Sequence, residues 1–234
     1  MDKQGTLIVL DGLDGCGKTT QFEALSRRMQ QAGIPVLPIS FPDYDHPSSA
    51  LVKLYLNGEI SPHAGDVNPY AASSFYAVDR YASFKRCWEQ PYRQGTAILA
   101  SRYVTSNAIH QMSKLPRQDW DAYLAWLSEY EYEKLELPKP DLVLFLDMPV
   151  AVSQKMLSSR YHGDESKKDI HESDVAYMEQ CRGAALYAAR KQGWQVISCC
   201  QGEQLMTVEE IGAQVWKVVC EKANVTVSPD HTGR

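Results

Sequence analysis

Short apolar runs alternate along the chain with longer segments in which apolar residues recur at helical spacing. The runs that predict buried strands cover residues 6–11, 34–40, 96–100, 141–147 and 194–199. Helical periodicity is found over residues 68–88, 118–135, 149–160 and 207–222. Two further helical segments end near residues 32 and 191. Strands that alternate with helices are typical of a parallel sheet covered on both faces. We therefore expect an α/β protein with three layers, a five-stranded parallel sheet flanked by helices.

Local signals mark several of the helix ends. Asn68 followed by Pro69 suits a helix start, because asparagine caps the first turn and proline needs no hydrogen-bond donor there. Gly33 supplies a stop for the first helix. The helix from residue 68 is predicted to run at least to Trp88, before Pro91 and Gly95.

The chain is interpreted as one domain, residues 1–223, because it contains no internal repeat and no linker. Residues 158–172 are charged and lack an apolar period, which predicts a lid segment that can move. Residues 224–234 are predicted to be a disordered tail.

Composition and charge exclude several classes of function. The chain has 234 residues, 44% of them hydrophobic and 23% charged, as in ordinary globular proteins. Its formal net charge of −5 argues against a general binder of nucleic acid or of membrane surfaces. No signal sequence or apolar run of about 20 residues is present, and the six cysteines form no C-x-x-C pair. We predict a cytoplasmic protein with reduced thiols.

The strongest motif is a glycine-rich loop between the first strand and the first helix. Residues 12–19 read G-L-D-G-C-G-K-T, and their glycines let backbone N–H groups converge on phosphate oxygens. Lys18 adds a positive charge at the β- and γ-phosphates, and the Thr19 hydroxyl can hold Mg²⁺. A chance glycine turn is the alternative, but the strand–loop–helix context favours a P-loop and hence a P-loop NTPase fold. The residues predicted to bind ATP are Gly12, Leu13, Asp14, Gly15, Cys16, Gly17, Lys18, Thr19 and Thr20.

A P-loop alone does not separate small-molecule kinases from switch GTPases or motor ATPases. The chain lacks the N-K-x-D sequence of guanine recognition, and it is too short for the apparatus of a motor. Arg80 and Arg102 are arginines where a second phosphate could lie, on a helix and at the end of a strand. Because phosphoryl transfer needs mainly charge neutralisation and alignment, these features favour a small-molecule kinase.

Six segments together resemble the thymidylate kinase family, from residue 5 to about residue 222. They read LIVLDGLDGCGKTTQ, FPDY, FYAVDRYA, SRYVTSNAIHQ, LPKPDLVLFLDMP and DIHESDVAY, in the order and spacing of that family. The resemblance implies a nucleoside-monophosphate kinase that uses ATP and Mg²⁺ to convert dTMP to dTDP. It also implies a homodimer.

The resemblance also implies roles for individual residues. Substrate contacts are implied for Asp14, Phe41, Tyr76, Arg80, Arg102, Ser106, Asn107, His110 and Gln111, and catalytic roles for Lys18, Arg160, Asp14 and Arg102. Asp14 would approach the sugar 3′-hydroxyl, Phe41 would wall the base pocket, and Arg102 would hold the acceptor phosphate. Ser106, Asn107 and Gln111 would lie at the base, and the amide of Asn107 would donate to a carbonyl and accept from N3–H.

Tyr76 and Arg80 are four residues apart, so on a helix they share one face. The resemblance implies that Tyr76 stacks on the base, and that Arg80 holds the 5′-phosphate bidentately or hydrogen-bonds the base. An aromatic residue in the core beside a surface arginine is the alternative for this pair. His110 would lie near the sugar 2′ position, and a structural histidine is equally consistent with the sequence.

The lid segment would supply the catalytic arginine. Gly15 stands where some family members have an arginine, so the chain resembles the subgroup in which that arginine, here Arg160, comes from the lid. Lys167 or Lys168 could assist, although solvated charges are the favoured interpretation of both. Glu172 matches a family carboxylate of unassigned role.

Two positions depart from the family pattern. Family members read Asp-Arg where this chain has Ser101 before Arg102, and the missing aspartate would lie near Mg²⁺. Tyr44 stands where other members present an arginine to the acceptor phosphate. Two alternatives therefore stay open: a kinase for another nucleotide or a deoxynucleoside, and a catalytically weak nucleotide-binding protein.

Overall fold

The protein is built around one parallel sheet with five strands. A computed structural model describes residues 4–160, 174–202 and 204–223. The strands are β1 (Leu7–Gly12), β2 (Val36–Ser40), β3 (Ala97–Ser101), β4 (Leu142–Asp147) and β5 (Gln195–Ser198). Their order is β2-β3-β1-β4-β5, and all four pairings are parallel. The predicted α/β fold and its sheet are confirmed, with strand ends shifted by one or two residues.

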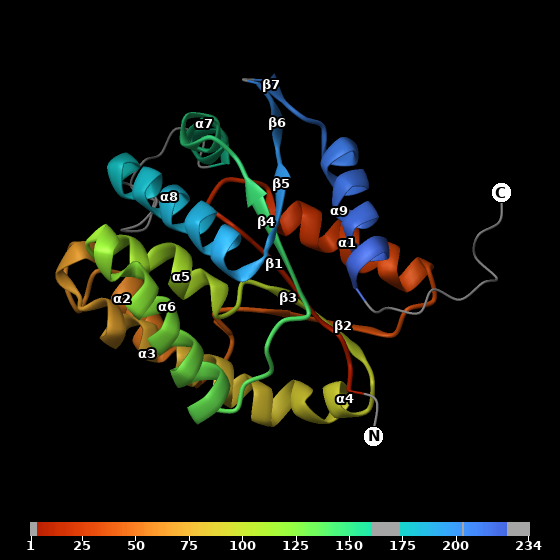
Figure 1. Ribbon diagram of the computed structural model, residues 1–234, viewed down its shortest axis with the longest axis horizontal. Coiled ribbons are helices and arrows are strands. Elements are labelled where there is room, and N and C mark those ends of the chain that lie inside the picture. Colours follow the sequence, from red (N-terminus) through yellow and green to blue (C-terminus); the bar gives the residue numbers. More distant parts are fainter. Residues whose placement is uncertain (1–3, 161–173, 203, 224–234) are drawn as a thin grey trace.

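Helices cover both faces of the sheet (Figure 1). They are α1 (Lys18–Gln31), α2 (Ala50–Leu56), α3 (Pro69–Ser83), α4 (Glu89–Arg93), α5 (Thr105–His110), α6 (Trp120–Ser128), α7 (Val150–Arg160), α8 (Val175–Gln192) and α9 (Val208–Lys222). Alternate residues of β1 point to opposite faces, since Leu7 and Val9 pack with α5, α6 and α8 while Ile8 and Leu10 pack with α1 and α9. Both faces are therefore buried, as parallel sheets require.

Short elements account for most differences from the sequence prediction. The helix that begins at Pro69 was predicted to run at least to Trp88, and it continues to Arg93, because a π-helical turn over Phe84–Trp88 joins α3 to α4. Pro91 is tolerated because it lies in the first turn of α4, where N–H groups have no partner within the helix. The helices α2 and α5 and the hairpin of β6 (Cys200–Gln201) and β7 (Gln204–Leu205) were not predicted.

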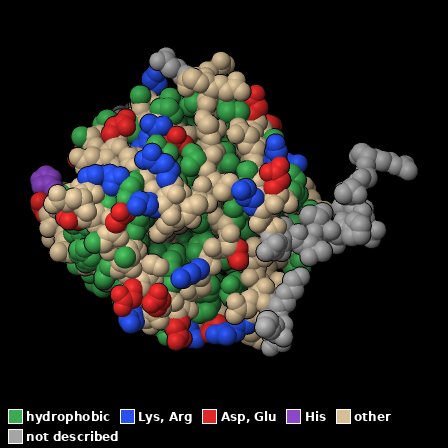
Figure 2. Space-filling view, in the orientation of Figure 1, with side chains coloured by type: hydrophobic (Ala, Val, Ile, Leu, Met, Phe, Trp, Pro, Cys, Tyr) green, Lys and Arg blue, Asp and Glu red, His purple; other side chains and the backbone are tan. Residues whose placement is uncertain are grey.

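The surface of the protein carries charges of both signs. On the face drawn in Figure 2, basic and acidic side chains are interspersed over the helices. Within the described ranges, no helix combines the length and the apolar character that crossing a membrane requires. All six cysteines are free thiols.

A lysine without a carboxylate partner in the described structure connects the segment after α5 to α2. The ammonium of Lys114 lies 2.8 Å from Tyr55 Oη, 3.4 Å from the carbonyl oxygen of Val67 and 4.9 Å from the centre of the Tyr55 ring. Burial disfavours the charged form and lowers the pKa of Lys114 from 10.5 to about 8. Below pH 8 the folded protein holds a proton on Lys114 in a place that disfavours it.

This shift predicts a pH-dependent effect of Lys114→Met on the free energy of unfolding. Between about pH 8 and 10.5 the unfolded chain binds the Lys114 proton and the folded protein does not, so this residue makes stability rise with pH. At pH 7 the wild-type protein loses on the order of 2–3 kcal/mol of unfolding free energy by keeping the Lys114 charge buried, and the variant avoids this loss but also gives up the hydrogen bond of Lys114. The gain in stability of the variant over the wild type should therefore shrink as the pH rises to about 10.5. Urea unfolding across this range measures the difference, with exposed Lys217→Met as the control. A difference that does not change with pH would contradict the prediction.

Candidate active site

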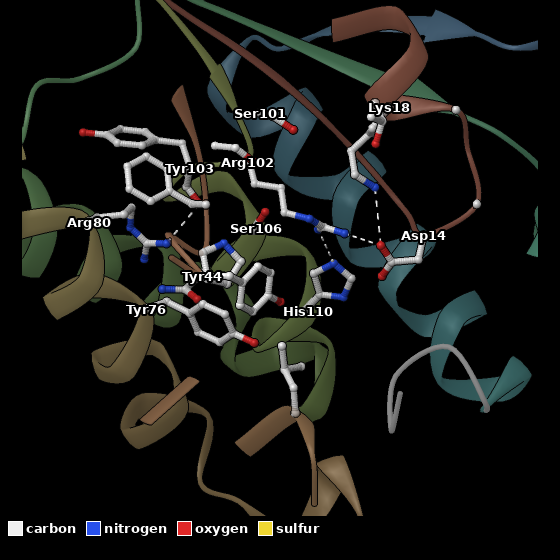
Figure 3. A pocket seen from close by; sticks show the side chains of 18 of the residues that line it. Asp14, Lys18, Tyr44, Tyr76, Arg80, Ser101, Arg102, Tyr103, Ser106 and His110 are labelled. Carbon is white, nitrogen blue, oxygen red and sulfur yellow. Dashed lines mark hydrogen bonds and ion pairs between the residues drawn. The ribbon is translucent and has the colours of Figure 1, made fainter. Parts of the chain in front are cut away.

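One cavity of about 650 Å³ opens at the carboxyl ends of β1, β2 and β3 (Figure 3). It is lined by P-loop residues on one side and by residues of β3, α3 and α5 on the other. Of the predicted residues, the lining includes Asp14, Gly15, Gly17, Lys18, Thr19, Thr20, Phe41, Tyr76, Arg80, Arg102, Ser106, Asn107, His110 and Gln111. Leu13 and Cys16 are buried beneath the loop, and Gly12 ends β1. The structure thus brings the two predicted groups of residues to one cavity.

The glycines of the P-loop meet distinct steric demands. Gly15 and Gly17 have φ angles of 77° and 82°, in the left-handed region that favours glycine. A Cβ at position 15 would lie 2.7 Å from Leu157 Cγ and 2.7 Å from the carbonyl oxygen of Ser153, so α7 closes over this glycine. Nothing lies within 4 Å of a Cβ at Gly17, which leaves room in front of the loop. The loop then enters α1, whose N-terminal N–H groups favour an anion.

Lys18 is held against the loop that precedes it. Its ammonium donates to the carbonyl oxygens of Gly12 at 2.9 Å and Leu13 at 2.8 Å, and it lies 3.5 Å from Asp14 Oδ1. These contacts keep the positive charge at the mouth of the P-loop.

Asp14 connects the P-loop to Arg102 across the cavity (Figure 3). Nη2 of Arg102 donates to Asp14 Oδ1, and Nη1 lies 3.2 Å from His110 Nε2. Because a guanidinium only donates, His110 Nε2 must accept, which assigns the neutral ring with its proton on Nδ1. Burial would lower the pKa of Arg102, but the carboxylates of Asp14 and Asp11 outweigh it and raise this pKa. Arg102 also has a φ angle of 65°, which is unusual outside glycine and common at functional sites.

Asp11 is a site residue that the sequence analysis missed. Its carboxylate is fully buried and accepts hydrogen bonds from the backbone N–H of Gly12 at 2.8 Å, from Thr105 Oγ1 at 2.7 Å and from Ser106 Oγ at 2.7 Å. Oδ1 lies 3.8 Å from Arg102 Nη1. Asp11 therefore connects β1 to α5 beneath the cavity. A charged residue at the end of an otherwise apolar strand was the available signal.

Phe41 and Tyr44 lie on the loop that follows β2. The Phe41 ring is buried 6.0 Å from the ring of Tyr103, and its N–H donates to the carbonyl oxygen of Ser101 at 3.0 Å. The buried carboxylate of Asp79 fixes the same loop, because it accepts from the N–H of Asp43 at 2.8 Å and from Ser48 Oγ at 2.5 Å. The half-exposed Tyr44 also lines the cavity.

Arg80 is held by a second buried carboxylate that was not predicted. Arg80 Nε and Nη2 donate to Glu131 at 2.7 and 2.6 Å, and Nη1 donates to the carbonyl oxygen of Tyr103 at 3.3 Å. Glu131 therefore occupies the edge of the guanidinium formed by Nε and Nη2, and one N–H group on each of Nη1 and Nη2 remains, so the bidentate contact with the 5′-phosphate stays a prediction. Hydrogen bonding to a base through the remaining two N–H groups stays a prediction.

Asn107 has both of its amide hydrogens engaged. Nδ2 donates to Glu131 Oε1 at 3.0 Å and to the carbonyl oxygen of Ser73 at 3.3 Å. The expected donation from Asn107 to a base carbonyl is thus not available, while acceptance through Oδ1 is. Glu131 lies in a π-helical turn over Glu129–Lys134, where the spacing departs from the usual helical period. No periodicity signal therefore marked it as buried.

Three further residues predicted to contact the substrate, Tyr76, Ser106 and Gln111, differ in the contacts that they already make within the protein. Tyr76 lines the cavity and packs edge-on against Tyr55, with ring centres 6.3 Å apart. The Ser106 hydroxyl is donated to Asp11, so only its lone pairs are available to a base. Gln111 is 1% exposed, and its Oε1 has no hydrogen-bond partner among the described residues, which leaves an acceptor in the cavity wall.

Thr19 is the residue at this cavity that could hold a Mg²⁺ ion. Among the described residues, no three His, Cys, Asp or Glu side chains form a metal-binding cluster. Thr19 is exposed and lines the cavity, so its hydroxyl is accessible. Mg²⁺ commonly takes one or two protein oxygens and completes its shell with phosphate oxygens and water. Ser101 ends β3 and lines the same cavity without adding a charge.

The predicted lid lies outside the described residues apart from its first three. Residues 158–160 are the last of α7. Lys167, Lys168 and Glu172 fall in residues 161–173, and the tail falls in residues 224–234; neither range is described. The side chain of Arg160 is likewise outside the description.

Comparison with known proteins identifies the family. The thymidylate kinase family model matches residues 10–210. The thymidylate kinase of Mycobacterium tuberculosis is 31% identical over 190 residues, which cover 80% of this chain and 87% of that protein. A probable thymidylate kinase of Pyrobaculum aerophilum is 24% identical over 212 residues, covering 91% and 95%.

A solved structure supports the same fold. The thymidylate kinase of Candida albicans matches with a TM-score of 0.67 and 22% identity, covering 93% of this chain and 92% of that one. Because the family model matches most of the chain and the Mycobacterium tuberculosis protein is 31% identical over 80% of it, the chain belongs to the thymidylate kinase family of phosphotransferases.

Proposed function

We propose that this protein transfers the γ-phosphate of ATP to dTMP and releases ADP and dTDP. The observation that carries the proposal is the cavity with a P-loop at one end and arginine- and amide-bearing walls at the other. A kinase of this kind needs two phosphate-bearing substrates in contact within a site that excludes water.

The transfer step forms one bond and breaks one. An oxygen of the dTMP phosphate attacks the γ-phosphorus of ATP, and the bond to the β,γ-bridging oxygen breaks so that ADP leaves with its electron pair. Lys18 and the N–H groups of the P-loop stabilise the charge of the donor phosphates. A Mg²⁺ ion at the Thr19 hydroxyl supplies further charge neutralisation and alignment when it is bound. Arg102 is positioned to hold the acceptor phosphate close to Asp14.

The acceptor wall suits a thymine base. Asn107 Oδ1 can accept a hydrogen bond, and Arg80 keeps two N–H groups that can donate. The wall therefore presents a hydrogen-bond acceptor next to hydrogen-bond donors. Thymine presents an N3–H donor beside the O4 acceptor, which is the complementary pattern. Phe41 and Tyr76 supply apolar and aromatic surface for the ring.

A panel of acceptors tests this function directly. With ATP and Mg²⁺, ADP release is expected to have the highest kcat/KM for dTMP when dTMP, dUMP, dCMP, dGMP, dAMP and thymidine are compared. Equal turnover of several acceptors, or a preference for thymidine, would favour the alternative kinase activities.

The panel also addresses the weak-binder alternative. Ser101→Asp restores the charge that family members carry at this position, and in an active kinase it should leave the order of acceptors unchanged. Should the wild-type protein be inactive with every acceptor while Ser101→Asp turns over dTMP, the protein is a nucleotide-binding protein that has lost its catalysis.

Arg160→Ala tests the proposed lid arginine. An arginine that acts on the transferring phosphate stabilises mainly the transition state, so kcat should fall by roughly 10²–10³-fold while the Kd for dTMP changes less than about threefold. Steady-state kinetics and calorimetric titration give the two quantities, with exposed Lys155→Ala on α7 as the control. A weaker affinity for dTMP with unchanged kcat would contradict the role.

We also propose that two copies of this chain form a dimer in the cytoplasm. The free thiols support a reducing compartment. Val78 and Tyr81 on α3 are 51% and 41% exposed and present an apolar strip for a second copy. Sedimentation is expected to give a dimer that Val78→Glu converts to monomer, with Glu23→Lys on α1 as the control. A monomeric wild-type protein would refute the proposed dimer.

A further inference from the structure

Glu131 lies behind the acceptor wall, and no solvent reaches it. Its side chain is 0% exposed, and that of Arg80 is 1% exposed. Glu131 Oε2 accepts from Arg80 Nε at 2.7 Å, while Oε1 accepts from both Arg80 Nη2 at 2.6 Å and Asn107 Nδ2 at 3.0 Å. One carboxylate therefore holds two of the side chains that line the acceptor end of the cavity.

A buried pair of this kind is weak evidence for stability. Removing two charges from water is costly, and an apolar pair of similar volume is often at least as stable. Burial by itself would lower the pKa of Arg80, but attraction to Glu131 and the hydrogen bonds between them raise it, so Arg80 stays charged. Stability alone does not require the buried pair of Arg80 and Glu131. A role of Glu131 in orienting neighbouring side chains would account for it.

Hydrogen-bond geometry shows what Glu131 orients. The two acceptors beside the Asn107 amide are Glu131 Oε1 and the carbonyl oxygen of Ser73, and neither can donate while Glu131 is ionised. The amide nitrogen must face both of them, because the opposite orientation would place Oδ1 against two oxygens. The amide oxygen is left as the group that Asn107 can offer to a base.

We propose that Glu131 is a positioning residue for base selection, which holds Asn107 with its oxygen toward the cavity and Arg80 with its spare donors beside it. The inference rests on the proposed function, since it assumes that a pyrimidine base lies against these two residues. It assigns Glu131 to discrimination between pyrimidines that carry N3–H and those that do not.

The chemistry of the two pyrimidine classes explains the selection. Thymine and uracil have a donor at N3 and an acceptor at O4, which match the Asn107 oxygen and the Arg80 N–H groups. Cytosine has an acceptor at N3 and a donor at N4, so both contacts would be mismatched. Buried polar groups left without partners are the strongest basis for rejecting a near-identical ligand.

Glu131→Gln tests the proposal because it keeps the shape and removes the charge. The amide introduced by this substitution can donate to Asn107 Oδ1, so only the longer contact with the Ser73 carbonyl oxygen still opposes a turn of the Asn107 NH₂ group toward the base. We expect the ratio of kcat/KM for dTMP to that for dCMP to fall by about 10- to 100-fold, with the change mainly in KM. Calorimetric Kd values for the same two nucleotides should shift in parallel. Glu129→Gln makes the same substitution at a half-exposed site in the same π-helical turn, and it should leave the ratio unchanged.

The ratio of dTMP to dUMP separates a positioning role from a general disturbance of the pocket. These two nucleotides differ at the 5-methyl group but have the same N3–H and O4, so their ratio should stay constant in Glu131→Gln. An equal loss for dTMP, dUMP and dCMP would show that Glu131 only supports the fold, and it would overturn the inference.

A second pair of variants keeps the test decisive if Glu131→Gln does not fold. Arg80→Gln with Glu131→Gln removes both buried charges together, and its dTMP-to-dCMP ratio is expected to fall at least about threefold below that of Arg80→Gln alone. An unchanged ratio would overturn the role of Glu131. A wild-type protein with no preference for dTMP over dCMP would instead overturn the proposed function, so the two failures are distinguishable.

Discussion

The site depends on the ion pairs of the Asp14 carboxylate, because this one group interacts with both halves of the cavity. It lies between the ammonium of Lys18 on the P-loop and the guanidinium of Arg102 at the end of β3. Without that negative charge, two cations would face each other at a place where two anionic substrates must also fit. Asp14 therefore fixes the distance between the donor and acceptor sides before any phosphate is present.

Buried carboxylates repeat this arrangement one layer deeper. Asp11 lies behind Arg102 and α5, and Glu131 lies behind Arg80 and Asn107. In each case a cation that faces the cavity is held from behind by an anion that solvent cannot reach. The cations keep their orientation but retain N–H groups for substrate, which is how preorganised charge stabilises a transferred group.

Much of the fold could be predicted because its signals are local. The central strands β1, β3 and β4 are nearly continuous apolar runs, and Asn68 with Pro69 marks the start of α3 where the structure has it. The P-loop follows from its motif, whereas the residues on the acceptor side of the cavity were expected only from the resemblance to the thymidylate kinase family. Partners in side-chain contacts could not be predicted, since Arg80 meets Glu131 across 51 residues and through a π-helical turn that disturbs the helical period. A second π-helical turn, over Phe84–Trp88, has no local signal either, and it carries the helix past Pro91 to Arg93.

Gly15 has a consequence for how such a chain can change during evolution. A Cβ at this position would lie so close to Leu157 and to the carbonyl oxygen of Ser153 that no side chain fits while α7 keeps its place. Acquiring an arginine in the P-loop would thus require compensating replacements along α7, the helix that ends at Arg160. The two locations for an arginine are coupled through this one steric contact, and related sequences should vary at position 15 and at the facing residues of α7 together.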